Sequence, residues 1–193
     1  MTDAMTFPWE NSPAGPAAAL ATGISSAIPT IATTRLRLRP PRIGDFQGYA
    51  SIVTTERGRH MGGPMTREEA WLDFNHLAAG WLLRGHGLWS VERLSGEALV
   101  GFVLVNHEFG DAEPELGFLL LDGEEGKGYA TEAAQAARHF AFGILGWRSL
   151  VSYIDAANAR SVALAERLGA ALDADASIDD LLVYRHIRAE GAK

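Results

Sequence analysis

Apolar and polar residues alternate through the segment TTRLRLRP at 33–40, which places its two leucines on one face and its arginines on the other. A period of two is typical of a half-buried strand. The arginine series, Arg35, Arg37, Arg39 and Arg42, is expected to form a solvated face rather than a nucleic-acid-binding stripe. Alternation or a short apolar run predicts further strands at 88–94, 98–109, 114–121, 149–156 and 180–187.

Helical patterns lie between these strands. Thr66, followed three residues later by Glu69, has the spacing of a capping box and predicts a helix that continues through Trp81. Further helices are expected at 46–55, capped by Asp45, at about 129–146, and at 161–169, where Gly169 ends the helix. The expected order is strand, two helices, three strands, helix, strand, helix, strand.

The first 32 residues lack this patterning and contain four prolines and a small-residue tract, Ala17 to Ala21. They predict a flexible or loosely docked extension at 1–32, ahead of one folded domain at 33–188 and a tail at 189–193. The opening carries Asp3 and Glu10 but no Lys or Arg before Arg35, unlike a secretory signal.

Composition and charge narrow the partners. The chain has 193 residues, 47% hydrophobic and 21% charged, which is typical of a soluble globular protein. Its net charge of −7 disfavours nucleic acid and tolerates an amine-bearing substrate. We expect no membrane span, because no apolar stretch of about eighteen residues occurs, and no metal site, because the six histidines show no ligand spacing and cysteine is absent. The lack of cysteine is compatible with a cytoplasmic location.

The most informative segment is the glycine segment, Gly126 to Thr131, which lies between a predicted strand and the longest predicted helix. Its two glycines allow a tight turn, and the helix start adds free N–H groups and the positive end of its dipole, so the segment can bind phosphate. A merely tight connection remains the alternative on spacing alone. The segment is neither a P-loop, because no Gly-Lys-Ser/Thr ending appears, nor a dinucleotide fingerprint.

Residues Glu125 to Ala130 resemble the acyl-CoA signature Q/R-x-x-G-x-G/A of the GNAT superfamily of N-acetyltransferases. "GKGYATEA" is similar to the branch of ribosomal-protein alanine and serine N-acetyltransferases. "TTRLRLRP", "GLWSVE", "ELGFLL" and "SYIDAANARSVALAERLGA" resemble further parts of that branch in the same order, so the resemblance covers roughly 33–188. Glu125 departs from the usual Gln or Arg and puts a like charge near the phosphates.

The resemblance implies an α+β fold of the α/β-sandwich type. It has a mixed, mostly antiparallel sheet with helices on both faces, and its central strands, here 114–121 and 149–156, splay apart to admit the pantetheine arm of acetyl-CoA. It implies cofactor contacts at Phe118, Leu119, Leu120, Glu125, Gly126, Lys127, Gly128, Tyr129, Ala130, Thr131, Asn158 and Ser161. From spacing alone, Asn158 is a helix cap and Ser161 an early-turn polar residue.

The family reaction is direct attack of an amine on the thioester, which requires a base. We choose Glu115, with Asp111, Glu113 or a water chain as alternatives; it could also be an ordinary solvated or paired carboxylate. Many relatives place a tyrosine acid where Ala165 stands, and Ser161 is the candidate substitute. Gly117 suggests a bulge or close backbone approach, and an N–H near Leu119 on that strand is the expected oxyanion donor.

The function expected on this basis is acetyl-CoA-dependent N-acetylation of a primary amine. The acceptor could be a protein N-terminus, an amino acid, a polyamine or an amine drug, because fold does not settle substrate. A homodimer is expected from family habit alone. The rival hypothesis, motivated by Ala165, is a CoA-binding sensor or structural module without turnover.

Overall fold

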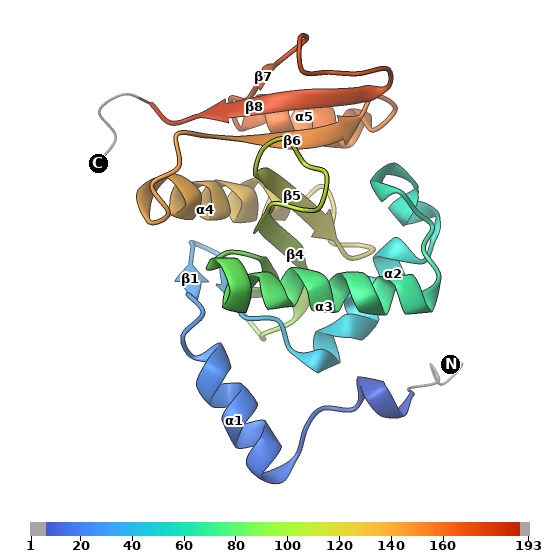
Figure 1. The fold of residues 1–193 in the computed structure, drawn as a ribbon, viewed down its shortest axis with the longest axis vertical. Coiled ribbons are helices and arrows are strands. Elements are labelled where there is room, and N and C mark those ends of the chain that lie inside the picture. The colour runs from blue at the N-terminus through green and yellow to red at the C-terminus, as the bar shows by residue number, and fades with distance from the viewer. Residues whose placement is uncertain (1–6, 190–193) are drawn as a thin grey trace.

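The computed structural model describes residues 7–189, and within them the strands form one eight-stranded sheet in the order β1-β2-β3-β4-β5-β6-β8-β7 (Figure 1). Neighbouring strands are antiparallel except β5 and β6, which are parallel. The strands are β1 Ile31–Ala32, β2 Leu36–Arg39, β3 Leu88–Arg93, β4 Leu99–Asn106, β5 Glu115–Leu120, β6 Ser149–Asp155, β7 Ala171–Leu172 and β8 Leu181–Ile187.

Helices cover both faces of this sheet (Figure 1). They are α1 Gly15–Ser25, α2 Phe46–Val53, α3 Arg67–Arg84, α4 Tyr129–Gly143 and α5 Ala159–Arg167, with short 3-10 turns η1 Pro8–Glu10, η2 Ile43–Asp45 and η3 Glu56–Met61. The predicted fold class, a mixed and mostly antiparallel sheet between helices, is confirmed. None of the helices in the described part of the chain is long and apolar enough to cross a membrane.

Strand β4 shows how the sequence pattern builds the two layers. Phe102 and Leu104 pack into the cluster formed with α2 and α3, whereas Val103 and Val105 pack into the cluster formed with α4. Successive side chains of a strand point to opposite faces, so a continuous apolar run is what a strand covered on both sides requires. Helix α3 begins as expected, because Thr66 and Glu69 form both bonds of a capping box.

The central strands part after a single residue pair. Strands β5 and β6 pair only at Glu115 and Val151, whereas β4 and β5 stay in register from Glu115 to Leu120. The predicted splay is therefore present. Because neither strand completes a ladder beyond this point, the space between them opens into the cleft described below.

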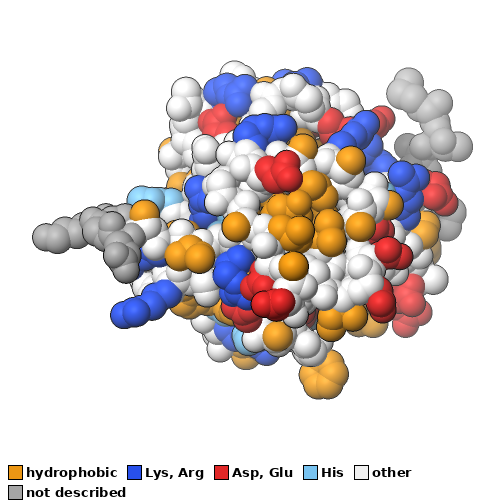
Figure 2. Space-filling model, turned by 90° about the horizontal axis from the view of Figure 1, so that it is seen from above, with side chains coloured by type: hydrophobic (Ala, Val, Ile, Leu, Met, Phe, Trp, Pro, Cys, Tyr) orange, Lys and Arg blue, Asp and Glu red, His pale blue; other side chains and the backbone are white. Residues whose placement is uncertain are grey.

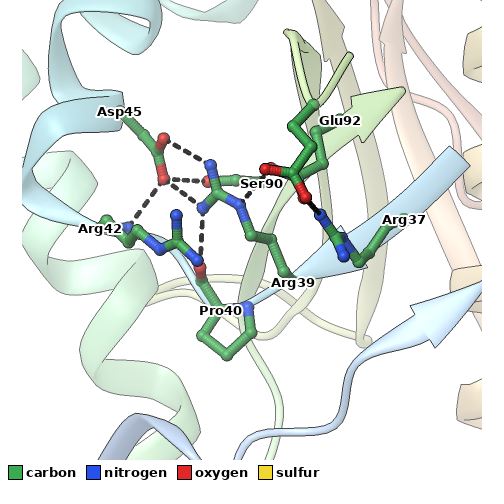
Figure 3. A network of polar contacts seen from close by, with 8 residues as sticks. Arg37, Arg39, Pro40, Arg42, Asp45, Ser90 and Glu92 are labelled. Atoms are coloured by element: carbon green, nitrogen blue, oxygen red, sulfur yellow. Dashed lines mark hydrogen bonds and ion pairs between the residues drawn. The ribbon is translucent and has the colours of Figure 1, made fainter. Parts of the chain in front are cut away.

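The arginine face of β2 is not solvated as predicted. Arg39 is only 7% exposed, and its guanidinium bonds the Asp45 carboxylate at 2.7 and 2.9 Å and Glu92 at 2.6 Å (Figure 3). Ser90 adds a 2.7 Å bond to Asp45, and Arg37 bonds the other oxygen of Glu92 at 2.5 Å. The expectation of a solvated face holds for Arg35 and Arg42, which are exposed. It fails for Arg39, because both of its acidic partners come from other elements, which the local alternation does not reveal.

Asp45 also has a different role from the predicted helix cap. It occupies the N-cap position of α2 but makes no side-chain capping bond to that helix. Its carboxylate instead accepts the Arg42 N–H at 2.8 Å and the bonds from Arg39 and Ser90. A carboxylate drawn into a buried ion pair is not free to cap the next helix.

Residues 7–32 contain the turn η1, helix α1 and strand β1. No residue of α1 is buried, yet Glu10 is 6% exposed and forms two 2.7 Å bonds with the Arg67 guanidinium on α3. Strand β1 pairs with β2, so the sheet begins two residues before the boundary that the pattern indicated. Of the expected tail, all but Ala189 lies outside the described residues.

Candidate functional site

A cleft of about 1850 Å³ opens where β5 and β6 part. Its walls come from β5, β6, the glycine segment, the start of α5, η3 and the loop after β4. Ile178 and Leu181 line its rim near β8. Figure 2 looks onto the β7–β8 end of the molecule, where apolar side chains gather in the middle of a face bearing both basic and acidic groups. The residues that line the cleft include apolar side chains, such as Phe118 and Leu119, and charged ones, such as Arg57 and Glu108.

The glycine segment forms one end of the cleft. Gly126 and Gly128 have φ angles of 73° and 80°, values that side-chain-bearing residues rarely adopt. Gly128 is the N-cap of α4 and provides no side-chain capping bond, so the first turn of the helix presents its N–H groups uncapped. Ala130 and Thr131 also line the cleft. This geometry is suited to a phosphate group.

Two residues of the segment have other contacts. The Lys127 ammonium bonds Glu124 at 3.0 Å, and the Tyr129 ring lies 4.9 Å beneath the Arg35 guanidinium. Neither lines the cleft. The expectation that they contact the cofactor therefore stays a prediction that rests on their backbone groups.

Arg35 holds the segment in place, a role that the sequence pattern did not reveal. Its guanidinium donates to the Lys127 carbonyl at 2.9 Å and to the Glu132 carboxylate at 2.7 Å. The Arg35 backbone N–H also bonds Glu132 at 2.8 Å. These bonds tie the start of β2 to the turn and to the first turn of α4. In the sequence, Arg35 is one member of the arginine series of this segment, and nothing in its spacing sets it apart from the others.

The charge of Glu125 is neutralised within the protein. Its two carboxylate oxygens accept bonds of 2.5 Å from Arg57 on η3 and from Arg160 on α5. Arg57 also donates to the Leu120 carbonyl at 2.9 Å. The like charge that the sequence placed near the phosphates is thus paired with two cations. Arg57 also lies 3.3 Å from the Asp122 carboxylate, so the two arginines and two carboxylates of this group balance in charge.

The turn η3 lies across the split between the central strands. It contacts β6, where His60 Nδ1 and the Asp155 carboxylate are 2.7 Å apart. The hydrogen bond from His60 lowers the pKa of Asp155. At its other end Arg57 is bonded to β5 through Leu120. The turn therefore connects both strands and covers the cleft from the side of α2.

Strand β5 supplies Phe118, Leu119 and Leu120 to the cleft wall; their expected contacts with pantetheine stay a prediction. It is not bulged, because its register with β4 is unbroken; the irregularity lies instead in the β3–β4 pairing, where β4 has one extra residue, Val100, opposite Val91 and Glu92. Gly117 is explained by close approach, since a Cβ there would lie 2.9 Å from the Leu104 side chain. The suggested bulge at Gly117 is therefore absent, and the oxyanion donor near Leu119 stays a prediction.

Glu115 lies at the point where the strands part and lines the cleft. Burial, with the nearby charges of Glu108 and Asp111, raises its pKa to about 8, although the Tyr153 N–H bonded to it acts in the opposite direction. A carboxyl group with a pKa in this range can exchange a proton near neutral pH. This position and this pKa suit a general base.

The two competing carboxylates differ from Glu115. Glu113 forms bonds of 2.5 and 2.6 Å with the Arg185 guanidinium, which lower its pKa, and it does not line the cleft. Asp111 lines the cleft, and its carboxylate accepts the Glu108 N–H at 2.7 Å. Glu113 is thereby engaged in a structural ion pair, while Asp111 shapes the loop beside Glu115.

The end of the cleft beyond Glu115 is acidic. Burial raises the pKa of Glu108, and the charges of Asp73 and Asp111 raise it further. Burial also raises the pKa of Asp73, against the hydrogen bond that the Tyr49 hydroxyl donates to it. The side chains of Asp73, Glu108, Asp111 and Glu115 all line the cleft. A cation bound here would relieve the repulsion among these carboxylates.

Asn158 and Ser161 line the cleft at the start of α5. The Asn158 side-chain oxygen accepts the Ser161 N–H at 3.2 Å, so the expected helix cap is present. Ala165, one turn further, is fully buried in a cluster with Ile154, Ala170 and Tyr184 and does not line the cleft. The hydroxyl that α5 contributes to the cleft is that of Ser161.

The described residues contain no group of three or more His, Asp or Glu side chains able to hold a metal ion.

Residues 35–171 match the protein family described as acetyltransferase (GNAT) domain. The structure is similar to that of an acetyltransferase from Agrobacterium tumefaciens str. C58, with 40% sequence identity and a TM-score of 0.80. That match covers 84% of this chain and 96% of the other.

Two more distant structures share the fold. A putative ribosomal-protein-serine acetyltransferase from Vibrio cholerae is 23% identical with a TM-score of 0.64, covering 82% of this chain and 97% of that one. RimL, a ribosomal L7/L12 α-N-protein acetyltransferase solved in complex with coenzyme A, is 18% identical with a TM-score of 0.67, covering 82% of this chain and 98% of that one.

Proposed function

The chain belongs to the GNAT acetyltransferase family, as its glycine segment predicted, and we propose that it transfers the acetyl group of acetyl-CoA to a primary amine by direct attack. One observation carries this proposal. A helix start suited to phosphate and a carboxyl group with a pKa of about 8 lie on the same cleft, which opens between splayed strands.

The residues present fit acetyl-CoA. The N–H groups from Gly126 to Thr131 would hold its diphosphate, and the Arg57 and Arg160 guanidiniums stand beside that position on Glu125. Backbone groups of 118–120 would bind pantetheine in the gap between β5 and β6, with Asn158 on the opposite wall. When bound, acetyl-CoA supplies the activated acyl group; the protein supplies its orientation.

The proposed chemistry needs two proton movements. Glu115 in its ionised form takes a proton from the attacking nitrogen as the nitrogen–carbon bond forms and the carbon–sulfur bond breaks. The Ser161 hydroxyl is the candidate donor to the departing sulfur, since it lies on the cleft where α5 begins. Because a thiolate is a good leaving group, loss of this donor is expected to cost less than loss of the base.

The acidic end of the cleft supports a cationic acceptor. Glu108, Asp73 and Asp111 lie beyond Glu115, and opposite charge favours binding of an amine that carries a second positive group. A basic protein N-terminus and a small polyamine both have this chemistry. RimL, which shares the fold, acts on a protein, as its name states. We place the reaction in the cytoplasm, and a homodimer remains a proposal.

The second candidate is a CoA-binding module without turnover. The observation that favours it is the buried Ala165, which leaves Ser161 as the hydroxyl on that helix facing the cleft. It predicts tight binding of acetyl-CoA and no release of thiol with any amine.

Thiol release from acetyl-CoA distinguishes the two. The panel contains diamines and polyamines, peptides with basic N-terminal residues, and matched amines carrying a carboxylate. Acetyl transfer predicts release with the cationic members and little with the carboxylates. Binding by calorimetry without release from any member would contradict the proposed reaction and favour the module.

A further inference from the structure

The split between β5 and β6 has an unusual set of hydrogen bonds. The one paired position, Glu115 with Val151, includes a Val151 N–H bond to the Pro114 carbonyl at 2.9 Å. Continued as a parallel ladder, the next bond would run from the Tyr153 N–H to the Leu116 carbonyl. Side chains take both groups instead. The Ser152 hydroxyl donates to the Leu116 carbonyl at 2.7 Å, and the Tyr153 N–H bonds Glu115.

Ser152 is held from behind by a buried histidine. His186 on β8 is 1% exposed, and its Nε2 lies 3.2 Å from the Ser152 oxygen. Because the hydroxyl proton is used on Leu116, Nε2 must carry the proton of this bond, which leaves Nδ1 to accept from Arg138 at 3.5 Å. Burial, with the charge of Arg138, lowers the pKa of His186 to about 4, so the ring stays neutral as this arrangement requires.

This set of bonds, from His186 through Ser152 to Leu116, is called the Ser152 bridge. A buried polar chain is costly unless every member is satisfied, and apolar residues would fill the same space between two strands. Ser152 is 2% exposed yet lines the cleft, and its partner Leu116 directly follows Glu115. The bridge thus stands where the position of Glu115 relative to β6 is set.

We propose that Ser152 is a positioning residue for the acetyl transfer, which replaces the missing ladder bond and so holds the two strands, and the Glu115 carboxyl between them, at the working separation. The proposal rests on the proposed function. The glycine segment, which would bind the cofactor phosphates, lies at the other end of the cleft. Loss of the hydroxyl should therefore affect the acceptor step and leave CoA affinity in place.

The test compares Ser152→Ala with Ser149→Ala, the same change on the same strand at a position outside the cleft. We expect Ser152→Ala to lower kcat/KM for the amine by about tenfold or more, with the Kd for CoA within about twofold of wild type. The acidic limb of the pH–rate profile should move to higher pH. The Tyr153 bond that opposes the effects of Glu108 and Asp111 on Glu115 weakens when the strands part.

Each result decides the matter. A kcat/KM and an acidic limb both equal to those of Ser149→Ala would overturn the proposal, whatever the effect on stability. If Ser152→Ala fails to fold, Ser152→Cys, which keeps the branching of the side chain with a weaker donor, is compared in the same way. If wild type itself releases no thiol, the proposed reaction fails. Amide exchange at Tyr153 then decides: exchange faster in Ser152→Ala than in Ser149→Ala supports the bridge, and equal exchange overturns it.

Discussion

Two groups of carboxylates in this protein, one buried and one partly buried, have opposite electrostatic surroundings. Beside β2, Asp45 and Glu92 enclose the Arg39 guanidinium (Figure 3); burial would raise the pKa of each, but the hydrogen bonds and charge of Arg39 lower both. In the cleft, burial and neighbouring carboxylates raise the pKa of Glu108 and Glu115, and no arginine or lysine bonds to either among the described residues.

The difference separates stability from function. Charges that are buried with a partner hold elements together, and removing one partner is costly. Carboxyl groups that are buried without a cation cost stability in their ionised form, and such groups cluster at functional sites. The Arg39 cluster is therefore expected to respond to mutation in folding, and the cleft carboxylates in activity. The following changes test that division from the largest expected effect to the smallest.

Arg39→Met removes the cation from the first group. Asp45 is then left buried without a cation, and Glu92 keeps only its bond to Arg37, so we expect the free energy of unfolding to fall by about 3–5 kcal/mol. Urea denaturation followed by circular dichroism measures it. Arg160→Met is the control, because that arginine side chain is 84% exposed and should cost less than about 1 kcal/mol. Equal losses in the two variants would contradict the division.

Glu115→Gln removes the proposed base from the second group. We expect kcat/KM to fall by roughly a hundredfold or more, with the Kd for CoA nearly unchanged. The wild-type rate should rise with pH through about 8, where Glu115 ionises, and this limb should disappear in the variant. Glu113→Gln, which breaks the Arg185 ion pair outside the cleft, should retain the limb. A profile in Glu115→Gln identical to wild type would remove the assignment.

The pH dependence of stability should have opposite signs in the two groups. The pKa of Asp45 is lowered on folding, so its contribution is present above the unfolded pKa of about 3.9 and is lost as pH falls. The pKa of Glu115 is raised, so its contribution is present below about 4.3 and is lost as pH rises toward 8. Asp45→Asn should destabilise by about 1–3 kcal/mol at pH 7 and by less near pH 3.

Glu115→Gln should match wild-type stability near pH 4 and exceed it at pH 9, where the wild-type carboxyl is ionised. Thermal unfolding across this range measures both variants. Parallel pH curves for the two would contradict the electrostatic contrast.

Glu108→Gln should have the smallest effect of the series. Removing one negative charge from the acceptor end is expected to raise KM for a dicationic amine about five- to tenfold, and to do so less at high salt. The KM for a monoamine serves as the internal control and should change by less than about twofold. An equal change in KM for both amines would show that Glu108 does not interact with the second positive charge of the amine.

The sequence predicted what depends on local pattern. The alternation of β2, the capping box of Thr66 and Glu69, and the glycines before α4 each act over a few residues and all appear in the structure. What it could not predict depends on distant partners. The burial of Arg39 requires Glu92, and the neutral surroundings of Glu125 require Arg57 and Arg160, all from other elements.

The same holds within the site. Glu115 was chosen from its place on a predicted strand, but its raised pKa depends on Glu108 and Asp111 folding back beside it. The Ser152 bridge joins three strands, and no spacing in the sequence indicates it. Hydrophobic periods of two and of about four residues thus predict the strands and helices. The pKa shifts and ion pairs depend instead on which of these elements become neighbours in the fold.

The central claim is that the glycine segment grips the phosphates of CoA, and a matched pair of substitutions tests it. Gly126 and Gly123 share a φ of 73° and have open space where a Cβ would lie, but Gly126 lines the cleft and Gly123 does not. Gly126→Glu and Gly123→Glu therefore carry the same backbone strain and the same added charge. Calorimetry with CoA should give a Kd at least about tenfold weaker for Gly126→Glu and within about twofold of wild type for Gly123→Glu. Equal affinities in the two variants would contradict the claim.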